Sequence, residues 1–366
     1  MTTRTVLHVG KVSGISGSEA HLLTLLPGLR DRGWDARFCL LHEGEPGAWE
    51  FSERLAATGV PVDEVRLARD LDPRAFARLA SVVRGVKPEL LHTHLVHADA
   101  YGLPAGKLAR VPVLASTKHG FNPFRDSRAF ALGDRSLGRL ADLQIAISAG
   151  LADYLAATEG FDRAAFEIVH YGIAAGPQPL PPPTEPRLVC VGRLVPIKGH
   201  ATLLRAFADA RRDVPGLSLA IAGDGPLRSE LEAQANRLEL GDAVHFAGRM
   251  TPVAPAYERA AMVVVPSLGE GFGMVALEAA ERGRAVIASA VGGLPEIVGE
   301  GTTGLLVAPS DSGALAAAIV RLASEPQRTA ELGRAGRERA LAEFSLDRCA
   351  DGIDALYRSA LARRGR

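Results

Sequence analysis

The chain has 366 residues, which exceeds one ordinary domain and fits two of typical size. Its 42 Lys and Arg residues balance its 42 Asp and Glu residues, so it lacks the global basic charge that non-specific nucleic-acid binding needs. This balance argues against nucleic acid as the main partner. With 47% hydrophobic but only 5% aromatic residues, the chain should have aliphatic cores, as in parallel sheets covered by helices.

Cysteine usage and the apolar runs bear on the cellular compartment. Cys39, Cys190 and Cys349 lie far apart, and the first two sit in apolar runs, as buried thiols do in a reducing compartment. The amino terminus runs directly into a strand pattern without a signal-peptide core. No apolar run approaches the ~20 residues of a membrane span. We therefore expect a cytoplasmic protein, with peripheral contact at the inner membrane face left open.

Strand-like runs alternate with amphipathic helical patterns through the first half of the chain. We expect a helix over residues 18–32 and strands at residues 5–10, 36–41, 90–94, 113–117 and 143–147. Alternation at this spacing predicts βαβ units and a parallel sheet. The fold class is α/β, with a first domain over residues 1–175.

A proline-rich stretch separates the two halves. Residues 176–186 contain six prolines in eleven positions, which excludes a helix or a central strand and indicates a stiff linker. A second α/β domain is expected over residues 187–345, followed by a terminal helix over 346–366 that crosses back to the first domain. Two such domains predict a cleft, with a ligand site at the carboxyl ends of strands. Strands are expected at 187–191, 217–222, 244–247, 262–266, 285–288 and 304–307, and helices from 198 and 227.

The second domain opens with the segment GRLVPIKG, which begins at Gly192. Arg193 and Lys198 follow a strand and stand beside a predicted helix start, where two cations and free N–H groups suit a pyrophosphate. Exposed cations on an ordinary surface loop are the alternative. The spacing by itself leaves both interpretations open.

A second motif, EGFGMVALE, runs from Glu270 to Glu278 after another predicted strand. Gly271 and Gly273 permit close backbone approach by a ligand, and carboxylates accept hydrogen bonds from sugar hydroxyls. The alternative is an acid that favours a helix dipole, followed by a solvated helix glutamate.

Taken in order, these two motifs and the segment GDGP from Gly223 resemble glycosyltransferase family 4. The resemblance covers nearly the whole chain. It implies the GT-B fold of two Rossmann-like domains and retaining transfer of a sugar from a UDP- or GDP-sugar to an acceptor hydroxyl. It implies neither a metal nor a cofactor beyond this nucleotide-sugar co-substrate. A nucleotide-sugar 2-epimerase and a non-catalytic nucleotide-sugar-binding scaffold remain alternatives.

The resemblance also implies roles for individual residues. Arg193 and Lys198 would hold the diphosphate and stabilise the leaving nucleotide, Glu270 would hold the donor sugar, and Glu278 would accept bonds from the ribose. In the first domain, His119 would contact the donor sugar, and a purely structural histidine is the alternative. The other implied donor-binding residues are Gly17, Gly192, Gly223, Arg249, Met250, Gly271, Phe272, Gly273 and Met274.

Two segments of the first domain depart from the family pattern. Ser16 replaces the first glycine of a Gly-Gly-x-Glu loop in which Gly17 remains, so a plain helix cap by Ser16 or Ser18 competes with ligand binding. Tyr171 and Ala174 replace residues of an Asn-Gly-hydrophobic-Asp turn near the domain junction.

Two patterns superficially suggest metal binding. His92 and His94 share one strand face and have His97 nearby, but no acidic or cysteine ligand completes the set in the sequence. Asp70 and Asp72 spell D-x-D, yet Asp72 precedes a proline and suits a helix cap. We expect no metal at either place.

The acceptor is the least defined partner. Cations are frequent over residues 118–139, which suits either a solvated helix or a face for an anionic or lipid-linked acceptor at a membrane. These cations are Lys118, Arg125, Arg128, Arg135 and Arg139, with Phe121, Phe124 and Phe130 among them.

Overall fold

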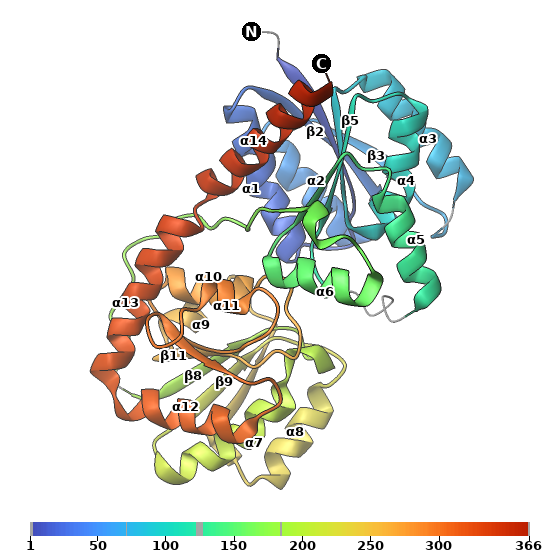
Figure 1. Ribbon diagram of the computed structural model, residues 1–366. Coiled ribbons are helices and arrows are strands. Elements are labelled where there is room, and N and C mark those ends of the chain that lie inside the picture. The colour runs from blue at the N-terminus through green and yellow to red at the C-terminus, as the bar shows by residue number, and fades with distance from the viewer. Residues whose placement is uncertain (1–2, 71, 122–126, 184, 365–366) are drawn as a thin grey trace. The chain divides into compact units, whose positions relative to one another are not determined.

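The computed structural model describes residues 3–70, 72–121, 127–183 and 185–364, without the side chains of residues 128 and 129 (Figure 1). The chain forms two compact units. The first comprises Met1–Gly172 together with Leu346–Arg366, and the second comprises Ile173–Ser345.

The first unit is built on a seven-stranded parallel sheet with the strand order β3-β2-β1-β4-β5-β6-β7. Its central strands are the expected ones. The edge strands β3 and β7 were not predicted, because β3 buries only Val65 fully and β7 has three residues. The strands are β1 (Arg4–Lys11), β2 (Trp34–His42), β3 (Val62–Arg66), β4 (Leu90–His94), β5 (Val113–Lys118), β6 (Leu143–Ala146) and β7 (Phe166–Ile168).

Helices cover both faces of this sheet. Side chains of β1 alternate, so that Val6 packs in a core with α1 and α14, whereas Leu7 packs on the other face with α3 and α4. Figure 1 shows α14 lying beside α1, so the last helix belongs to the core of the first unit. The helices are α1 (Gly17–Asp31), α2 (Pro46–Ala56), α3 (Pro73–Val86), α4 (Leu95–Leu108), α5 (Arg128–Gly138), α6 (Ala149–Glu159) and α14 (Leu346–Arg364).

The second unit has a six-stranded parallel sheet with the order β10-β9-β8-β11-β12-β13. The strands are β8 (Arg187–Val191), β9 (Ser218–Ala222), β10 (Val244–Gly248), β11 (Met262–Val265), β12 (Ala285–Ser289) and β13 (Gly304–Val307). The helices are α7 (His200–Asp213), α8 (Arg228–Arg237), α9 (Ala254–Glu258), α10 (Met274–Glu281), α11 (Leu294–Ile297), α12 (Ser312–Ser324) and α13 (Pro326–Glu343).

One helix start differs from the expectation. The helix expected from residue 198 begins at His200, because a 3-10 turn over Pro196–Lys198 precedes it. Gly199 separates the two with a left-handed φ of +69°. Lys198 therefore sits on the loop that leads into α7 rather than in the helix itself.

Strand order reverses at one point in each sheet. In the first unit the chain runs outward on either side of the β1–β4 pair, and in the second unit on either side of the β8–β11 pair. Open parallel sheets bind ligands at the carboxyl ends of strands beside such a reversal. The loops after β1, β4, β8 and β11 are therefore the places to look for a site. None of the described helices combines the length and apolar content that crossing a bilayer requires.

Candidate functional site

In the second unit, the loops after β8 and β11 bring two predicted residues together. Lys198 Nζ lies 2.5 Å from Glu270 Oε2, and Ser267 Oγ donates to the same oxygen at 3.2 Å. The side chains of Lys198 and Glu270 are 23% and 16% exposed, so this ion pair remains within reach of solvent. The pair stands at the reversal of strand order.

Arg193 lies on the same loop as Lys198, with an exposed side chain that forms no ion pair with any described residue. The loop is held by backbone contact with its neighbour after β9. A Cβ atom at Gly223 would lie 1.8 Å from the carbonyl oxygen of Gly192, so only glycine fits there. Leu194 N also donates to Asp224 O at 2.9 Å. These contacts fix the loop backbone and leave the Arg193 guanidinium available to a ligand.

The second motif forms the start of α10. Gly273 adopts a φ of +116° and caps the helix, which begins at Met274, while Gly271 and Phe272 are buried before it. The Phe272 ring packs edge-on against Phe344, with 5.8 Å between ring centroids. The positive end of a helix dipole thus lies beside Glu270.

Glu278 is a partly buried, hydrogen-bonded residue of α10, so the alternative of a solvated helix glutamate is wrong. Tyr257 of α9 donates to Glu278 Oε2 at 2.7 Å. Burial raises the pKa of Glu278, although the Tyr257 bond and Arg282 oppose the rise. Sequence reasoning missed Tyr257, because a tyrosine 21 positions upstream carries no motif signal.

The segment expected to bind a base follows β10. Gly248 ends that strand, Arg249 is exposed, and Met250 is half-buried. Met250 lines a cavity of about 430 Å³, together with Ala222 and Ala247. The cavity wall is largely aliphatic at this end.

His200, the first residue of α7, is a further polar group that sequence reasoning missed. It is 2% exposed, and neither ring nitrogen has a hydrogen-bond partner in the part of the chain that the structure describes. It borders a void of about 10 Å³ shared with Lys198, Ser267 and Glu270. Burial and the charge of Lys198 lower its pKa to about 4, so the ring is neutral at pH 7.

In the first unit, His119 follows β5 and is 9% exposed. Both of its ring nitrogens are engaged: Nδ1 is hydrogen-bonded to the Tyr171 hydroxyl, and Nε2 lies 2.9 Å from His94 Nδ1. Burial, with His21 and Lys118, holds the pKa of His119 well below its ordinary value. Tyr171, one of the departures from the family pattern, is thus a direct partner of the predicted histidine.

The predicted Gly17 is the first residue of α1, directly after the N-cap residue Ser16. The Glu19 carboxylate accepts hydrogen bonds from Ser16 N at 3.0 Å and from Ser16 Oγ at 2.5 Å. Ser18 Oγ also donates to Glu19, at 3.0 Å. Ser16 and Glu19 thus form a capping box at this helix start, which follows β1 and lies beside the reversal of strand order.

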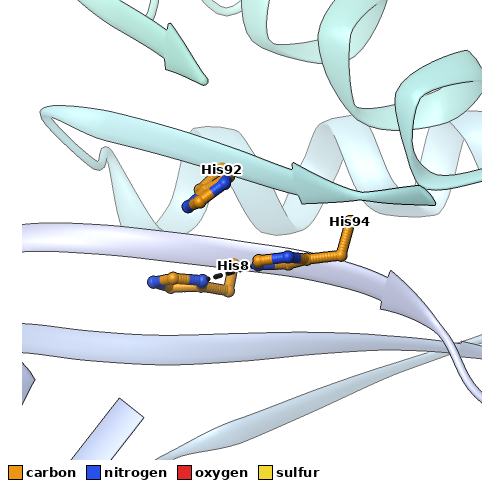
Figure 2. A group of neighbouring side chains, drawn as sticks. All are labelled: His8, His92 and His94. Atoms are coloured by element: carbon orange, nitrogen blue, oxygen red, sulfur yellow. Dashed lines mark hydrogen bonds between the residues drawn. The ribbon is translucent and has the colours of Figure 1, made fainter. Parts of the chain in front are cut away.

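The expected histidine group has a different membership. His97 is partly exposed and lies 3.4 Å from Asp70, away from His92 and His94. His8 of β1 takes its place: Figure 2 shows it facing His92 and His94 of the neighbouring strand β4.

The D-x-D pattern has the structural role that was expected of it. Asp72 caps α3 by accepting a hydrogen bond from Arg74 N at 2.9 Å. Asp70 pairs with Lys11 at 3.2 Å. Leu71 lies outside the described residues.

The interpretation of Lys118 as a surface cation is wrong. Its ammonium group is fully buried, 2.7 Å from both Asp99 of α4 and Asp134 of α5. Arg125 and Phe124 lie outside the described residues, as does the side chain of Arg128. Arg139 is exposed and Arg135 half-buried, so the described part of this stretch presents fewer surface cations than expected.

Comparison with known proteins covers both units. Residues 16–172 match the family model "Glycosyl transferase 4-like domain", and residues 176–339 match "Glycosyl transferases group 1". The chain is 33% identical over 293 residues to glycogen synthase of Mycobacterium tuberculosis, an alignment that spans 76% of this chain and 70% of that relative.

Two further proteins resemble parts or all of the chain. A GDP-mannose-dependent α-(1-6)-phosphatidylinositol monomannoside mannosyltransferase of Mycolicibacterium smegmatis is 39% identical over 166 residues, 43% of this chain and 44% of that protein. The solved structure of Anabaena HepE with UDP-glucose superposes with a TM-score of 0.83 at 22% identity, over 97% of this chain and 99% of the other. That likeness shows the fold, two parallel α/β sheets of the GT-B type.

Proposed function

This chain belongs to the group 1, family 4-like glycosyltransferases, and we propose that it is a retaining, metal-independent enzyme using a UDP- or GDP-sugar. As a nucleotide-sugar-dependent glycosyltransferase, it moves a glycosyl group from its donor to an acceptor. HepE was solved with UDP-glucose, and the mycobacterial mannosyltransferase depends on GDP-mannose, which supports these two donor classes.

The observation that carries the proposal is the cation group at the reversal of strand order in the second unit. Lys198 is paired with Glu270, and Arg193 stands exposed on the same loop. A diphosphate there would gain charge-assisted bonds from both cations. When the sugar departs, negative charge builds up on the diphosphate, and these fixed cations would stabilise it in the role that a metal ion has elsewhere.

The neighbouring residues would bind the sugar, ribose and base of the donor. Glu270, with the helix start at Phe272, Gly273 and Met274, would hold the sugar hydroxyls. Glu278 would accept hydrogen bonds from the ribose, and Tyr257 keeps its carboxylate oriented. The base would enter beside Met250, at the aliphatic end of the cavity.

The first unit would contribute His119 and the helix start at Gly17. Because both ring nitrogens of His119 are engaged, a sugar hydroxyl reaching Nδ1 has to replace the Tyr171 hydroxyl there. The N–H groups at the start of α1 would face a diphosphate or the acceptor. We propose an anionic or lipid-linked acceptor only as a candidate for screening, since the buried Lys118 removes one of the cations that suggested it.

Replacing Arg193 or Lys198 by Ala tests the diphosphate site. Loss of one charge-assisted bond is worth roughly 1.5–3 kcal/mol, so binding of a nucleoside diphosphate should weaken about ten- to a hundredfold, as calorimetry would measure. Binding of the free nucleoside should stay nearly unchanged. An equal loss for both ligands would point to a damaged unit and contradict the assignment.

Metal independence has its own measurement. Transfer in excess EDTA should match transfer with added Mg²⁺ or Mn²⁺, because Arg193 and Lys198 supply the positive charge. A strict metal requirement would overturn this part of the proposal.

A further inference from the structure

Seven buried side chains of the first unit form one continuous hydrogen-bonded chain. It starts at Tyr171, continues through His119 and His94 to His8 of β1, and reaches Tyr357 of α14. From there it returns to His92 and ends at Thr117. The links are Tyr171–His119, His119–His94 at 2.9 Å, His94–His8 at 2.8 Å, His8–Tyr357 at 3.4 Å, Tyr357–His92, and His92–Thr117 at 2.6 Å.

The sheet explains why these residues meet. His8 and His92 are register partners on the adjacent strands β1 and β4, and His94 follows His92 on the same face. Helix α14 covers that face, and its Tyr357 packs against the histidine rings. Figure 2 shows the imidazoles of His8 and His94 side by side with nearly parallel planes, and the hydrogen bond between them.

The four rings of the chain are neutral. His8, His92 and His94 are at most 2% exposed, and burial lowers the pKa of His8 to about 3 and of the other two well below the usual value. A neutral imidazole has one N–H donor and one nitrogen acceptor. Each ring in the chain uses both nitrogens.

This pairing couples the tautomers of all four rings. If Tyr171 donates to Nδ1 of His119, each following ring must accept at Nδ1 and donate from Nε2, as far as Thr117. If the chain runs the other way, all four rings carry their proton on Nδ1. Between two imidazoles, a mixture would set two donors or two acceptors against each other, which is costly at a buried link. At Tyr357, whose hydroxyl can accept two hydrogen bonds but donate only one, a mixture would leave the hydroxyl proton or one ring nitrogen without a partner in the chain.

We propose that His94, His8, Tyr357 and His92 are positioning residues that hold His119 in one shared tautomer. The chain thereby decides whether Nδ1 of His119 meets the donor sugar with a proton or with a lone pair. The inference rests on the proposed contact between His119 and the sugar. It extends the candidate site through the core to the carboxyl-terminal helix, with no charged group among its members.

A metal ion is the competing occupant of these rings. His8, His92 and His94 could each offer one nitrogen, with the ligand atoms within 4.8 Å of one another. A cation there would need nitrogens that now bond to each other and to Tyr357, and would be buried without a carboxylate or thiolate in that group. The hydrogen-bonded chain satisfies the same atoms without a charge.

Nitrogen-15 NMR of histidine-labelled, ligand-free protein tests the coupling without using activity. We expect His8, His92, His94 and His119 all to be neutral and all to carry the same tautomer, with each ring assigned by its own substitution. Tyr357→Phe should release His92 from the shared tautomer. Mixed tautomers in the wild type, or stoichiometric zinc in protein purified without chelator, would overturn the proposal.

Activity supplies the second measurement, with Tyr101→Phe as the matched control. Tyr101 is a buried tyrosine of the same unit whose hydroxyl also makes two hydrogen bonds, to Asp72 N and Asp70 O, away from the chain. Tyr357→Phe removes the links to both His8 and His92. We expect it to lower kcat by about two- to tenfold, and Tyr101→Phe to change kcat less than twofold. Equal losses in both would reduce the chain to a structural role.

Two further variants keep the outcomes separable. Thr117→Val removes the other end of the chain and replaces Tyr357→Phe if that protein does not fold. It should shift His119 toward Nδ1–H, since an unpaired acceptor on His92 costs less than an unpaired donor. His119→Ala tests the proposed function: full activity would refute the sugar contact, whereas the NMR result would still decide whether the chain exists.

Discussion

The two units both place polar side chains at the carboxyl ends of their strands, yet they bury them differently. In the first unit, Lys118 is completely buried between two aspartates. In the second unit, Lys198 and Glu270 are 23% and 16% exposed, and their ion pair faces solvent. Fully buried charges stabilise the fold around them, whereas a partly exposed pair can exchange partners with a ligand.

The histidines repeat this contrast. Four histidines of the first unit, His8, His92, His94 and His119, bond to one another or to tyrosines, whereas His200 of the second unit has no partner among the described residues. The first unit therefore presents a preorganised group, and the second presents groups whose interactions are completed by what binds. Ligand binding would then reorganise the groups around Lys198, whereas the groups around His119 already hold one another.

Acid should produce the largest difference between the units. Burial lowers the pKa of His8 and His21 to about 3, and that of His92, His94 and His119 well below 6.5. The unfolded chain takes up protons below pH ~6.5, while the native state does not until far lower pH. Native stability is thus fully present above pH ~6.5 and declines as the pH falls, by up to about 1.4 kcal/mol per pH unit for each histidine.

The second unit has one histidine with a resolved shift, His200, whose pKa is lowered to about 4. On acidification, we expect the first unit to lose structure at a higher pH. Trp34 and Trp49 are the only tryptophans of the chain and both belong to the first unit, so fluorescence reports on it selectively. Hydrogen exchange of peptides from β8 and β11 would report on the other unit. If the second unit instead lost its structure at the higher pH, the contrast drawn between the two units would be wrong.

The two lysines provide the next test, measured by urea unfolding. Lys118→Met leaves Asp99 and Asp134 buried without their cation and should cost about 3–5 kcal/mol. Lys198→Met removes a partly exposed pair and should cost less than about 1 kcal/mol. It should nevertheless weaken diphosphate binding about ten- to a hundredfold. Asp134→Asn is a milder substitute if the Lys118 variant does not fold. Similar losses of stability for the two lysine variants would show that the second pair is also structural.

The fold was predictable because its signals are local. Apolar strands alternate with helices, and the motif residues Arg193, Lys198 and Glu270 follow strands whose carboxyl ends meet at one sheet edge. The buried clusters were not predictable. In the sequence, Lys118 has the pattern of a surface residue, because its partners Asp99 and Asp134 lie on two separate helices. His8 and His92 are far apart in the sequence and become neighbours only through the register of their strands. Contacts that form only through tertiary packing produce no recognisable residue spacing in the sequence.

The smallest expected effect concerns His200, replaced by leucine. A buried imidazole without partners costs stability through the lost hydration of its nitrogens, about 1–3 kcal/mol for an unsatisfied group. His200→Leu should therefore leave stability at pH 7 unchanged or raise it by up to about 2 kcal/mol, because the apolar side chain has no such cost. The variant should also take up one proton fewer when the second unit unfolds in acid, because His200 is no longer there to be protonated.

His94→Leu is the control, because it replaces a histidine that has two partners. It leaves one nitrogen of His8 and one of His119 without a hydrogen-bond partner. Each of these unpaired nitrogens should destabilise the protein by about 1–3 kcal/mol. If His200→Leu is as harmful as His94→Leu, His200 has a partner after all. The void of about 10 Å³ beside it, shared with Ser267 and Glu270, is close to the least that one water needs. A bound water there would tie His200 to Glu270, and the second unit would then be as preorganised as the first.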